Sequence, residues 1–466
     1  TVAGRAGDKM DIQIIAGLLT TLHQLRQRDR WTRQHLETHQ SRSLHLLRAY
    51  AYARSPFYQQ FHRGLADRPL HELPVLTKAM MMENFDALVT DRAICREAIE
   101  AHLAGAEAHR RFLGRYWINA TSGSSGRPGL FLFDRNEWTA ILAAFARAYE
   151  WAGIWLSLTR RRKMAVVAST TPWHMSAQVG ATVHTWWTPT LSLAATEPLE
   201  TIVRQLNAWQ PETLVAYASM VGLLADEQRA GRLHIAPAPV FTSSEVLTEE
   251  TRRRVEAAWG KTLFNQYAAT EGGSLAAECA QHQGMHLAED MVIFEVVDQD
   301  NRPVPPGMFG DKALLTVLFS RTQPLIRYEL SDRVRLAAAP CPCGRPYALI
   351  DAVQGRVEEV LTFPAIAGGE VTVHPNVFHQ VMDIVPAREW RVVQERDGVK
   401  VLLSGVQEGF ADVTLADALR RALAAQGVRV SGIEVQRVAA LPRTAAGKSP
   451  LIQSNAHCTT TASGAP

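Results

Sequence analysis

The stretch Thr262-Leu-Phe-Asn-Gln-Tyr-Ala-Ala-Thr-Glu-Gly-Gly273 decides the fold predicted for this chain. Its first part, Thr262–Gln266, has the apolar pattern of a short strand, and Tyr267, Thr270 and Glu271 follow in a small polar turn. Open α/β sheets bind ligands where their strands end, so this turn is a candidate binding site. An aromatic ring can lie against a nucleobase there, and a carboxylate can hold Mg²⁺. An ordinary polar turn with a helix cap would use the same residue types.

Strands and helices alternate before this stretch. Strand candidates lie at Met164–Ala168, Thr213–Ala216 and Ala238–Thr242, and a helix candidate lies at Thr248–Trp259. Because such alternation is typical of parallel sheets that helices cover, we predict an α/β fold with a large N-terminal lobe.

The two flanks of this lobe have other patterns. About the first hundred residues are helical, with a second helix expected at Leu44–Phe61. Strands predominate between 291 and 336, which indicates a small β-barrel-like subdomain. After Arg356 a β-β-α-β pattern predicts a small, mobile α+β lid. The expected elements are the strands Val292–Val297, Ala313–Leu318, Leu325–Tyr328, Trp390–Glu395, Val399–Leu403 and Ile433–Val438 and the helix Leu415–Ala425.

These patterns divide the chain into four predicted parts. They are a helical segment at 1–112, a core at 113–355 that holds most of the candidate binding residues, the lid at 356–456 and a disordered tail at 457–466.

The composition limits the partners and the location. Of the 466 residues, 47% are hydrophobic and 20% charged, which is typical of a globular protein. The formal charge, 49 − 46 = +3, is too small for a protein that binds nucleic acid through its phosphates. No apolar run approaches the ~20 residues that cross a bilayer, and Thr1–Lys9 has no apolar stretch of a signal peptide. We expect a cytoplasmic protein with no nucleic-acid and no membrane partner.

A second candidate site is the loop Thr121-Ser-Gly-Ser-Ser-Gly-Arg-Pro-Gly129. Its small residues let backbone N–H groups converge on an anion, and its hydroxyls add donors, which suits a triphosphate. It is not a Walker A loop, because the spacing GxxxxGK[S/T] is absent. A flexible Gly/Ser linker would have a similar composition.

Two further motifs carry charged side chains. Arg327-Tyr-Glu-Leu-Ser-Asp332 and the later Arg356 offer a carboxylate for ribose hydroxyls and a guanidinium for the ribose or a phosphate. Lys448 lies in a Gly/Ala segment near the end of the lid, from which a lysine can swing into a site. Taken alone, a surface ion pair and a solvated lysine would show the same residues.

In their order and spacing, these motifs resemble the adenylate-forming superfamily, and specifically its phenylacetate–coenzyme A ligase-like branch. The resemblance covers nearly the whole chain. The segments that carry it are Leu73–Lys78, Asn84–Asp86, Thr121–Gly129, Ser243–Glu245, Tyr267–Glu271, Arg327–Asp332, Cys341–Arg345, Gly355–Arg356 and Lys448.

The resemblance implies a role for each matching residue. The β- and γ-phosphates of ATP are implied to lie on Thr121, Ser122, Gly123, Ser124, Ser125, Gly126 and Arg127. The adenine is implied to lie among Ser243, Ser244, Glu245, Asn265 and Tyr267, and the ribose beside Asp332 and Arg356. The catalytic residues are implied to be Thr270 at the α-phosphate, Glu271 at Mg²⁺, and Lys448 between the acid and the α-phosphate.

The pocket for the acid is the least defined part. Aromatic walls favour an aryl or arylalkyl acid, although simple core packing would also use such residues. The candidates are Trp173, His174, Tyr217, Ala218, Ser219 and Gly272.

A separate group of residues suggests a metal. Cys341 and Cys343 form a Cys-Pro-Cys-Gly knuckle, and Cys279 and His286 follow the quoted strand. Cys₃His is a tetrahedral zinc set, and four protein ligands would make the zinc structural rather than catalytic. His282 competes with His286 as the fourth ligand, and four residues without a metal are the alternative.

The resemblance implies an enzyme that uses ATP and Mg²⁺ to convert a small carboxylic acid to an acyl-adenylate and then transfers the acyl group to coenzyme A. Several residues depart from the branch, including Ala268, Arg127 and the segment Ala367–Pro375 near the thiol-forming step. Two alternatives to coenzyme A transfer therefore stay open. The acyl group could be transferred to an amine or a carrier protein, or the enzyme could adenylate a hydroxyl instead of an acid. A scaffold without activity is disfavoured by Glu271, Asp332 and Lys448, and a homodimer stays open beside a monomer.

Overall fold

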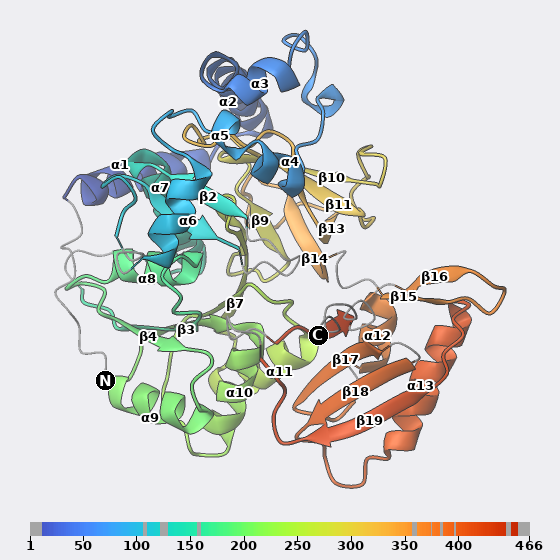
Figure 1. The fold of residues 1–466 in the computed structure, drawn as a ribbon. Helices are drawn as coiled ribbons and strands as arrows, with labels where there is room; N and C mark the ends of the chain where they lie inside the picture. The colour runs from blue at the N-terminus through green and yellow to red at the C-terminus, as the bar shows by residue number, and fades with distance from the viewer. Residues whose placement is uncertain are drawn as a thin grey trace, which may run out of the picture.

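The protein is described from a computed structural model that defines residues 12–105, 110–121, 129–155, 160–356, 361–373, 375–382, 385–395, 398–443 and 449–454. Figure 1 shows a large lobe, which holds residues 12–356, and a small lobe, which holds residues 361–454, beside it.

A nine-stranded sheet organises the large lobe, in the order β13-β14-β9-β8-β7-β6-β5-β3-β4. Its parallel half confirms the predicted α/β fold. The strands of this half are β3 (Met164–Ala168), β4 (Thr190–Ala194), β5 (Thr213–Tyr217), β6 (Val240–Ser243) and β7 (Leu263–Ala269).

β7 is the boundary between the two halves of this sheet. It runs parallel to β6 but antiparallel to β8 (Gly273–Glu278), with a register shift between Tyr267 and Ala268. The strand is longer than the predicted Thr262–Gln266, because its pairing with β8 continues to Ala269. Tyr267 therefore lies within the strand, and the turn is limited to residues 270–272.

The antiparallel half and a small second sheet form the strand-rich part. The antiparallel half of the nine-stranded sheet consists of β8, β9 (Met285–Leu287), β14 (Leu349–Arg356) and β13 (Asp332–Leu336). The second sheet consists of β10 (Val292–Val297), β11 (Lys312–Val317) and β12 (Tyr328–Leu330). The strand predicted at Leu325–Tyr328 was wrong in its bounds. Arg327 has φ +51°, which interrupts an extended strand, so β12 begins after it.

Helices cover both faces of the parallel half. α7 (Arg135–Trp151) and α8 (Met175–Val183) lie over one face, and α9 (Leu199–Trp209), α10 (Ala218–Arg229) and α11 (Glu249–Trp259) pack on the other. The other helices described in the large lobe are α1 (Ile12–Arg28), α2 (Arg33–Arg54), α3 (Pro56–Phe61), α4 (Lys78–Glu83), α5 (Phe85–Leu88), α6 (Arg96–Ala104) and the short turn η1 (Leu70–Glu72).

The helix predicted at Leu44–Phe61 is divided in two, which corrects that prediction. Pro56 cannot continue a helix from within, so α2 ends at Arg54. Ser55 then accepts a hydrogen bond from the Tyr58 backbone N–H and begins α3.

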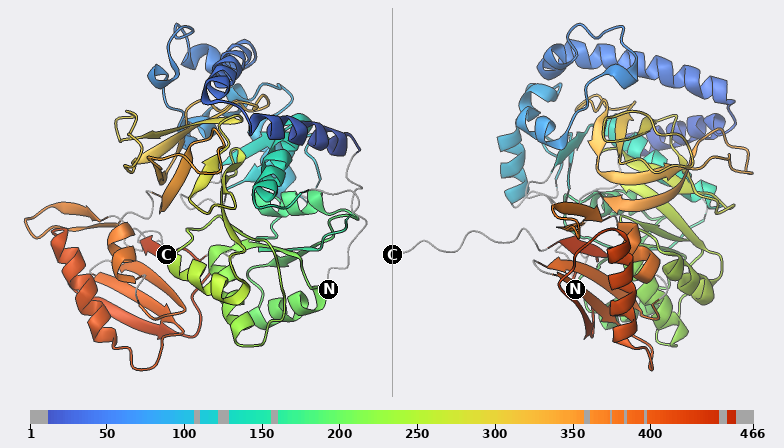
Figure 2. Two further views of the ribbon diagram at one scale, coloured as in Figure 1. Left: turned by 180° about the vertical axis from the view of Figure 1, so that it is seen from behind. Right: turned by 90° about the vertical axis from the view of Figure 1, so that its right-hand side faces the viewer.

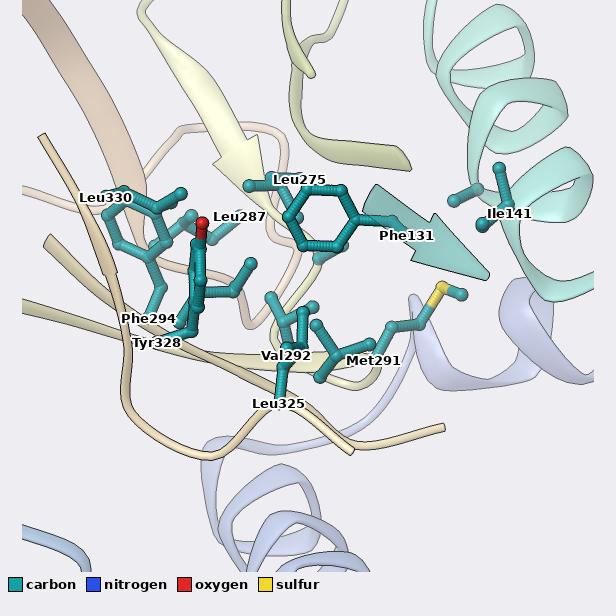
Figure 3. Packing of buried hydrophobic residues seen from close by; sticks show 14 of the residues in the cluster. Phe131, Ile141, Leu275, Leu287, Met291, Val292, Phe294, Leu325, Tyr328 and Leu330 are labelled. Atoms are coloured by element: carbon teal, nitrogen blue, oxygen red, sulfur yellow. The ribbon is translucent and has the colours of Figure 1, made fainter. Parts of the chain in front are cut away.

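The core of the large lobe joins these elements. Figure 3 shows Phe131 of the hairpin β1 (Trp117–Ala120) and β2 (Leu130–Phe133) packed among residues of the sheets. Ile141 of α7 and Leu275 of β8 belong to the same buried cluster. This packing fixes the position of the turn between β7 and β8.

The small lobe has one four-stranded sheet, in the order β19-β18-β17-β20, with helices on it (Figure 2). The predicted β-β-α-β pattern is present, and β20 adds a strand to it. The elements are β15 (Leu361–Pro364), β16 (Glu370–Val373), α12 (Pro375–Met382), β17 (Glu389–Glu395), β18 (Gly398–Ser404), α13 (Asp412–Ala425), β19 (Ile433–Val438) and β20 (Ile452–Ser454). In the part of the chain that the structure describes, no helix has both the length and the apolar composition to span a membrane.

Candidate functional site

A cleft of about 2340 Å³ lies at the carboxyl ends of the parallel strands and extends to the small lobe. Residues from several of the predicted motifs meet there, although they are far apart in the sequence. The predicted site residues that line it are Thr121, His174, Tyr217, Ser219, Ser243, Ser244, Glu245, Asn265, Tyr267, Thr270, Glu271 and Asp332.

The predicted adenine and ribose residues are in direct contact. The Tyr267 hydroxyl donates to Asp332 Oδ2 at 2.8 Å, although 65 residues separate the two in the chain. Asp332 begins β13, where its Cα is the register partner of Arg356 in β14. The stretch 262–273 and the motif 327–332 therefore meet at one edge of the cleft, beside Arg356.

The turn after β7 contributes a carboxylate, Glu271, to the lining of the cleft. Glu271 is only 8% exposed, yet it lines the cleft. The turn requires Gly273, which has φ +76° and whose Cα approaches α7 so closely that a Cβ would lie 2.9 Å from Ile141. Gly272, a candidate for the acid pocket, faces the core instead, because a Cβ there would meet Leu275 at 3.0 Å.

The two ends of the predicted phosphate loop are held together at the mouth of the cleft. The Thr121 N–H donates to the Gly129 carbonyl at 3.0 Å, and the Gly129 N–H donates to Thr121 Oγ1 at 2.8 Å. The candidates between them, Ser122 to Arg127, lie outside the described residues. Lys78 of α4 approaches the same end, since its Cε would lie 3.4 Å from a Cβ at Gly129.

Glu245 connects the large lobe to the small lobe. One of its carboxylate oxygens accepts from the Ser219 N–H at the start of α10, at 2.8 Å. The other accepts from the Ser449 N–H of the small lobe, also at 2.8 Å. Lys448 precedes Ser449 in the sequence but lies outside the described residues. Glu245, which was predicted on the adenine side, thus makes a contact between the lobes that the sequence did not predict.

Arg391 of β17 is a residue of the site that the sequence analysis missed. It is buried, and its Nε donates to the Pro450 carbonyl at 2.9 Å while its Nη2 donates to the Pro442 carbonyl and to Ser449 Oγ. Arg391 therefore holds together both ends of the segment that contains Lys448. The sequence feature that could have indicated this role is an arginine within the apolar strand sequence Trp390-Arg-Val-Val393. A charged side chain that is buried needs fixed hydrogen-bond partners.

The candidates for the acid pocket are divided between the cleft and the core. The His174 ring lies 2.6 Å from Ser169 Oγ, and the Tyr217 hydroxyl accepts from the Ser169 N–H at 2.9 Å, so these residues form one polar group at the ends of β3 and β5. Trp173 packs instead against the buried cluster around Tyr116, and Ala218 is buried within α10.

The predicted metal residues also come together, and none of the four is among the residues that line the cleft, although the segment 280–285 between Cys279 and His286 does line it. The ligand atoms of Cys279, His286, Cys341 and Cys343 all lie within 4.8 Å of one another. Cys279 Sγ is 3.8 Å from Cys341 Sγ, and Cys343 Sγ is 3.2 Å from His286 Nε2. The competing ligand His282 contacts Glu278 instead, at 3.3 Å.

Burial keeps the imidazole of His286 neutral, which leaves a ring nitrogen able to bind a metal. Burial lowers the pKa of His286 to about 4 and raises the pKa of the Cys279 thiol to about 12. A metal would replace the proton on a buried thiol, because a coordinating thiol is deprotonated. The donor set, three sulfurs and one nitrogen, fits zinc.

Comparison with known proteins gives the same relationship from sequence and from structure. No family model matches the chain. A phenylacetate-coenzyme A ligase of Thermus thermophilus is 26% identical over 390 residues, which cover 78% of this chain and 80% of the relative. The protein CapK of Staphylococcus aureus is 26% identical over 142 residues, 30% of each chain.

Two solved structures of 2-hydroxyisobutyryl-CoA ligase share the fold. The structure in the postadenylation state has a TM-score of 0.68 at 20% identity and covers 88% of this chain and 87% of that one. The structure in the thioesterification state, with an adenylate and CoA, has a TM-score of 0.60 at 21% identity and covers 92% of both chains. The chain has the fold of adenylate-forming CoA ligases, and its sequence similarity confirms the resemblance to the phenylacetate–coenzyme A ligase-like branch.

Proposed function

We propose that this protein is an ATP-dependent acid–thiol ligase. A carboxylate oxygen of the acid attacks the α-phosphorus of ATP, and pyrophosphate leaves with the electron pair of the broken P–O bond. The sulfur of coenzyme A then attacks the acyl carbon, and AMP leaves with the oxygen that came from the acid. The observation that carries the proposal is the meeting of Tyr267, Asp332 and Glu271 with Thr121, the first residue of the loop 121–129, in one cleft.

Each group in the cleft has a chemical task in this reaction. Asp332 would accept from the ribose hydroxyls, with the backbone of Arg356 beside it. Tyr267 would lie against the adenine, and Thr270 would donate to the α-phosphate. Glu271 would hold Mg²⁺, which reduces the repulsion between the two anionic reactants.

The small lobe would supply Lys448 to the first step. An ammonium is a compact charge that can lie between a carboxylate and a phosphate. Glu245 and Arg391 support this proposal, because they fix the residues on both sides of the segment that contains it.

We propose a structural zinc at the four-residue cluster. Four protein ligands leave no position for a substrate, so this zinc would stabilise the fold and take no part in the reaction. A cytoplasmic location is also part of the proposal, since ATP and coenzyme A are cytoplasmic reactants.

Acid-dependent exchange of pyrophosphate into ATP tests the function. The full chain is incubated with ATP, Mg²⁺ and a panel of aryl, arylalkyl and aliphatic acids, and each active acid is then offered coenzyme A, an amine or a carrier protein. We expect exchange with apolar acids and a thioester with coenzyme A. Exchange followed only by amide formation would mean that the acceptor is an amine rather than coenzyme A. Absence of exchange with all acids would overturn the proposed function.

A further inference from the structure

Two valines in the centre of the parallel sheet are not fully buried. Strands of a parallel sheet that helices cover are normally buried on both faces. Val166 of β3 and Val215 of β5 are only half-buried and line the cleft, whereas Val167 and Leu214 on the opposite face are completely buried. A hollow therefore lies over one face of the sheet.

The strand register gives the length of this hollow. Val215 is the register partner of Val166, and Thr213 is the partner of Met164, so both pairs lie on the face to which Tyr217 belongs. These residues line the cleft from the carboxyl end of β5 to its first residue. At ~3.3 Å per residue, the four steps from Tyr217 to Thr213 span roughly 13 Å.

Two helices form the other walls, each with one apolar stripe. The stripe of α7 has the spacing i, i+3, i+4, i+7, and the stripe of α8 the spacing i, i+4, i+5, i+8. At ~1.5 Å per residue these stripes are roughly 10 Å and 12 Å long, which agrees with the length along the strand. The residues that line the hollow are Leu142, Phe145, Ala146 and Tyr149 of α7 and Met175, Val179, Gly180 and Val183 of α8. We call this hollow the apolar channel.

The apolar channel connects the reactive end of the cleft with the protein surface. Its inner end lies at Tyr217, close to the group formed with Ser169 and His174. Its outer end is polar and aromatic, with Arg162 and Trp187 among the lining residues. Trp155, which is 61% exposed, also lines the cleft. Between the two ends, the wall residues from β3, β5, α7 and α8 are uncharged.

We propose that the apolar channel binds the body of the acid, and that the substrate is an elongated, apolar monocarboxylic acid whose uncharged body is about 10 to 13 Å long. This proposal rests on the proposed function and makes its substrate class more specific. A single aromatic ring next to the carboxylate would fill only the inner part of the channel. A longer body would displace water from the whole length, and each buried methylene would improve kcat/KM by about threefold to fourfold.

A chain-length series measures the channel. Straight-chain acids from butanoic to dodecanoic acid, and phenyl-substituted acids of increasing length, are compared in the pyrophosphate exchange assay. We expect kcat/KM to rise with length and then reach a plateau when the body fills the channel. A maximum at the shortest acids, with no gain from added methylenes, would overturn the proposal.

Two obstructing variants locate the channel. Val215→Phe obstructs the middle and is expected to lower kcat/KM for long acids at least tenfold while short acids keep their rate. Val183→Phe obstructs the outer end, and kcat/KM of this variant should fall only for longer acids. Val413→Phe, the same change at an exposed position of α13, is the matched control. Equal losses for short and long acids in both variants would overturn the channel.

Binding without turnover separates this proposal from the proposed function. A fluorescent long-chain acid should bind the wild type and be displaced by dodecanoic acid but not by butanoic acid. If no acid supports exchange but this displacement occurs and is lost in Val215→Phe, the channel stands and the ligase function fails. If short acids support exchange but the long-chain probe does not bind, the ligase function stands and the channel fails.

Discussion

The Cys/His cluster and the cleft are both built from residues far apart in the sequence, but only the cluster is complete within one lobe. Its four side chains come from β9 and from segments next to β8 and β14, and their ligand atoms already lie within 4.8 Å of one another. The cleft takes Tyr267, Glu271 and Asp332 from the large lobe and the neighbour of Lys448 from the small lobe. Loss of a cluster residue should therefore reduce stability, whereas loss of a contact between the lobes should reduce a rate.

The largest effect is expected from Lys448→Ala. Without the ammonium, formation of the acyl-adenylate should fall by about two to four orders of magnitude, because the charge acts in the transition state. ATP binding and acyl transfer from a synthetic adenylate should persist. The free energy of unfolding should be unchanged. Single-turnover measurement of both half-reactions is the test.

Lys400→Ala in β18 is the matched control, since Lys400 contacts only carboxylates of the small lobe among the ion pairs identified, Glu395 and Glu434. An equal loss of both half-reactions in Lys448→Ala would mean that this lysine is structural.

The cluster should respond in the opposite way. Cys341→Ser should lower the free energy of unfolding by about 3 kcal/mol or more, because a closed metal site contributes to folding. The rate per folded molecule should change by less than about threefold. Metal analysis should give about one zinc per wild-type chain.

Cys95→Ser changes an exposed free cysteine outside the cluster and should leave stability and zinc content unchanged. Wild-type protein that contains no metal, when purified without a chelator, would contradict the zinc proposal.

Glu245→Gln tests whether the contact between the lobes acts on the rate. The amide has one oxygen and no charge, so one of the two N–H donors, Ser219 or Ser449, loses its acceptor and the other keeps only a neutral one. Adenylation should fall about tenfold, and the Ser449 amide should exchange with deuterium faster. Glu200→Gln, at the start of α9, is the control. A tenfold loss with unchanged exchange at Ser449 would assign Glu245 to the adenine pocket alone.

The smallest effect is expected from the ion pairs at the edge of the contact. Arg388 of the small lobe lies 3.2 Å from Asp226 and 3.3 Å from Glu227 of α10. Partly exposed ion pairs contribute about 0.5 to 1 kcal/mol, so Arg388→Ala should slow adenylation by about twofold to fivefold. The difference should disappear at high salt. A loss that does not depend on salt would indicate a packing role for the arginine stem.

The sequence predicted those parts of the fold that depend on a local pattern. β3, β10 and β19 agree with the predicted bounds, and β3 and β10 end directly before a polar residue, Ser169 and Asp298. β7 was predicted too short, because its last residues are held by pairing with β8 rather than by their own composition. The four members of the Cys/His cluster were predicted from residue type, and His286 rather than His282 lies with the three cysteines.

The contacts between the lobes and the apolar channel were beyond sequence reasoning. Glu245 and Ser449 are 204 residues apart, and nothing in either segment indicates the other. The strand sequence around Val215 is that of any buried strand, and only the positions of α7 and α8 show that one of its faces is open. Both features depend on how whole elements pack against each other.

The most direct test of the central claim follows one oxygen atom. The acid is labelled with ¹⁸O in its carboxylate and is converted by the full chain with ATP, Mg²⁺ and coenzyme A in unlabelled water. If the carboxylate attacks the α-phosphorus, one labelled oxygen must appear in AMP, and pyrophosphate must remain unlabelled. Label in orthophosphate, with ADP as the product, would mean attack at the γ-phosphorus and would contradict the account.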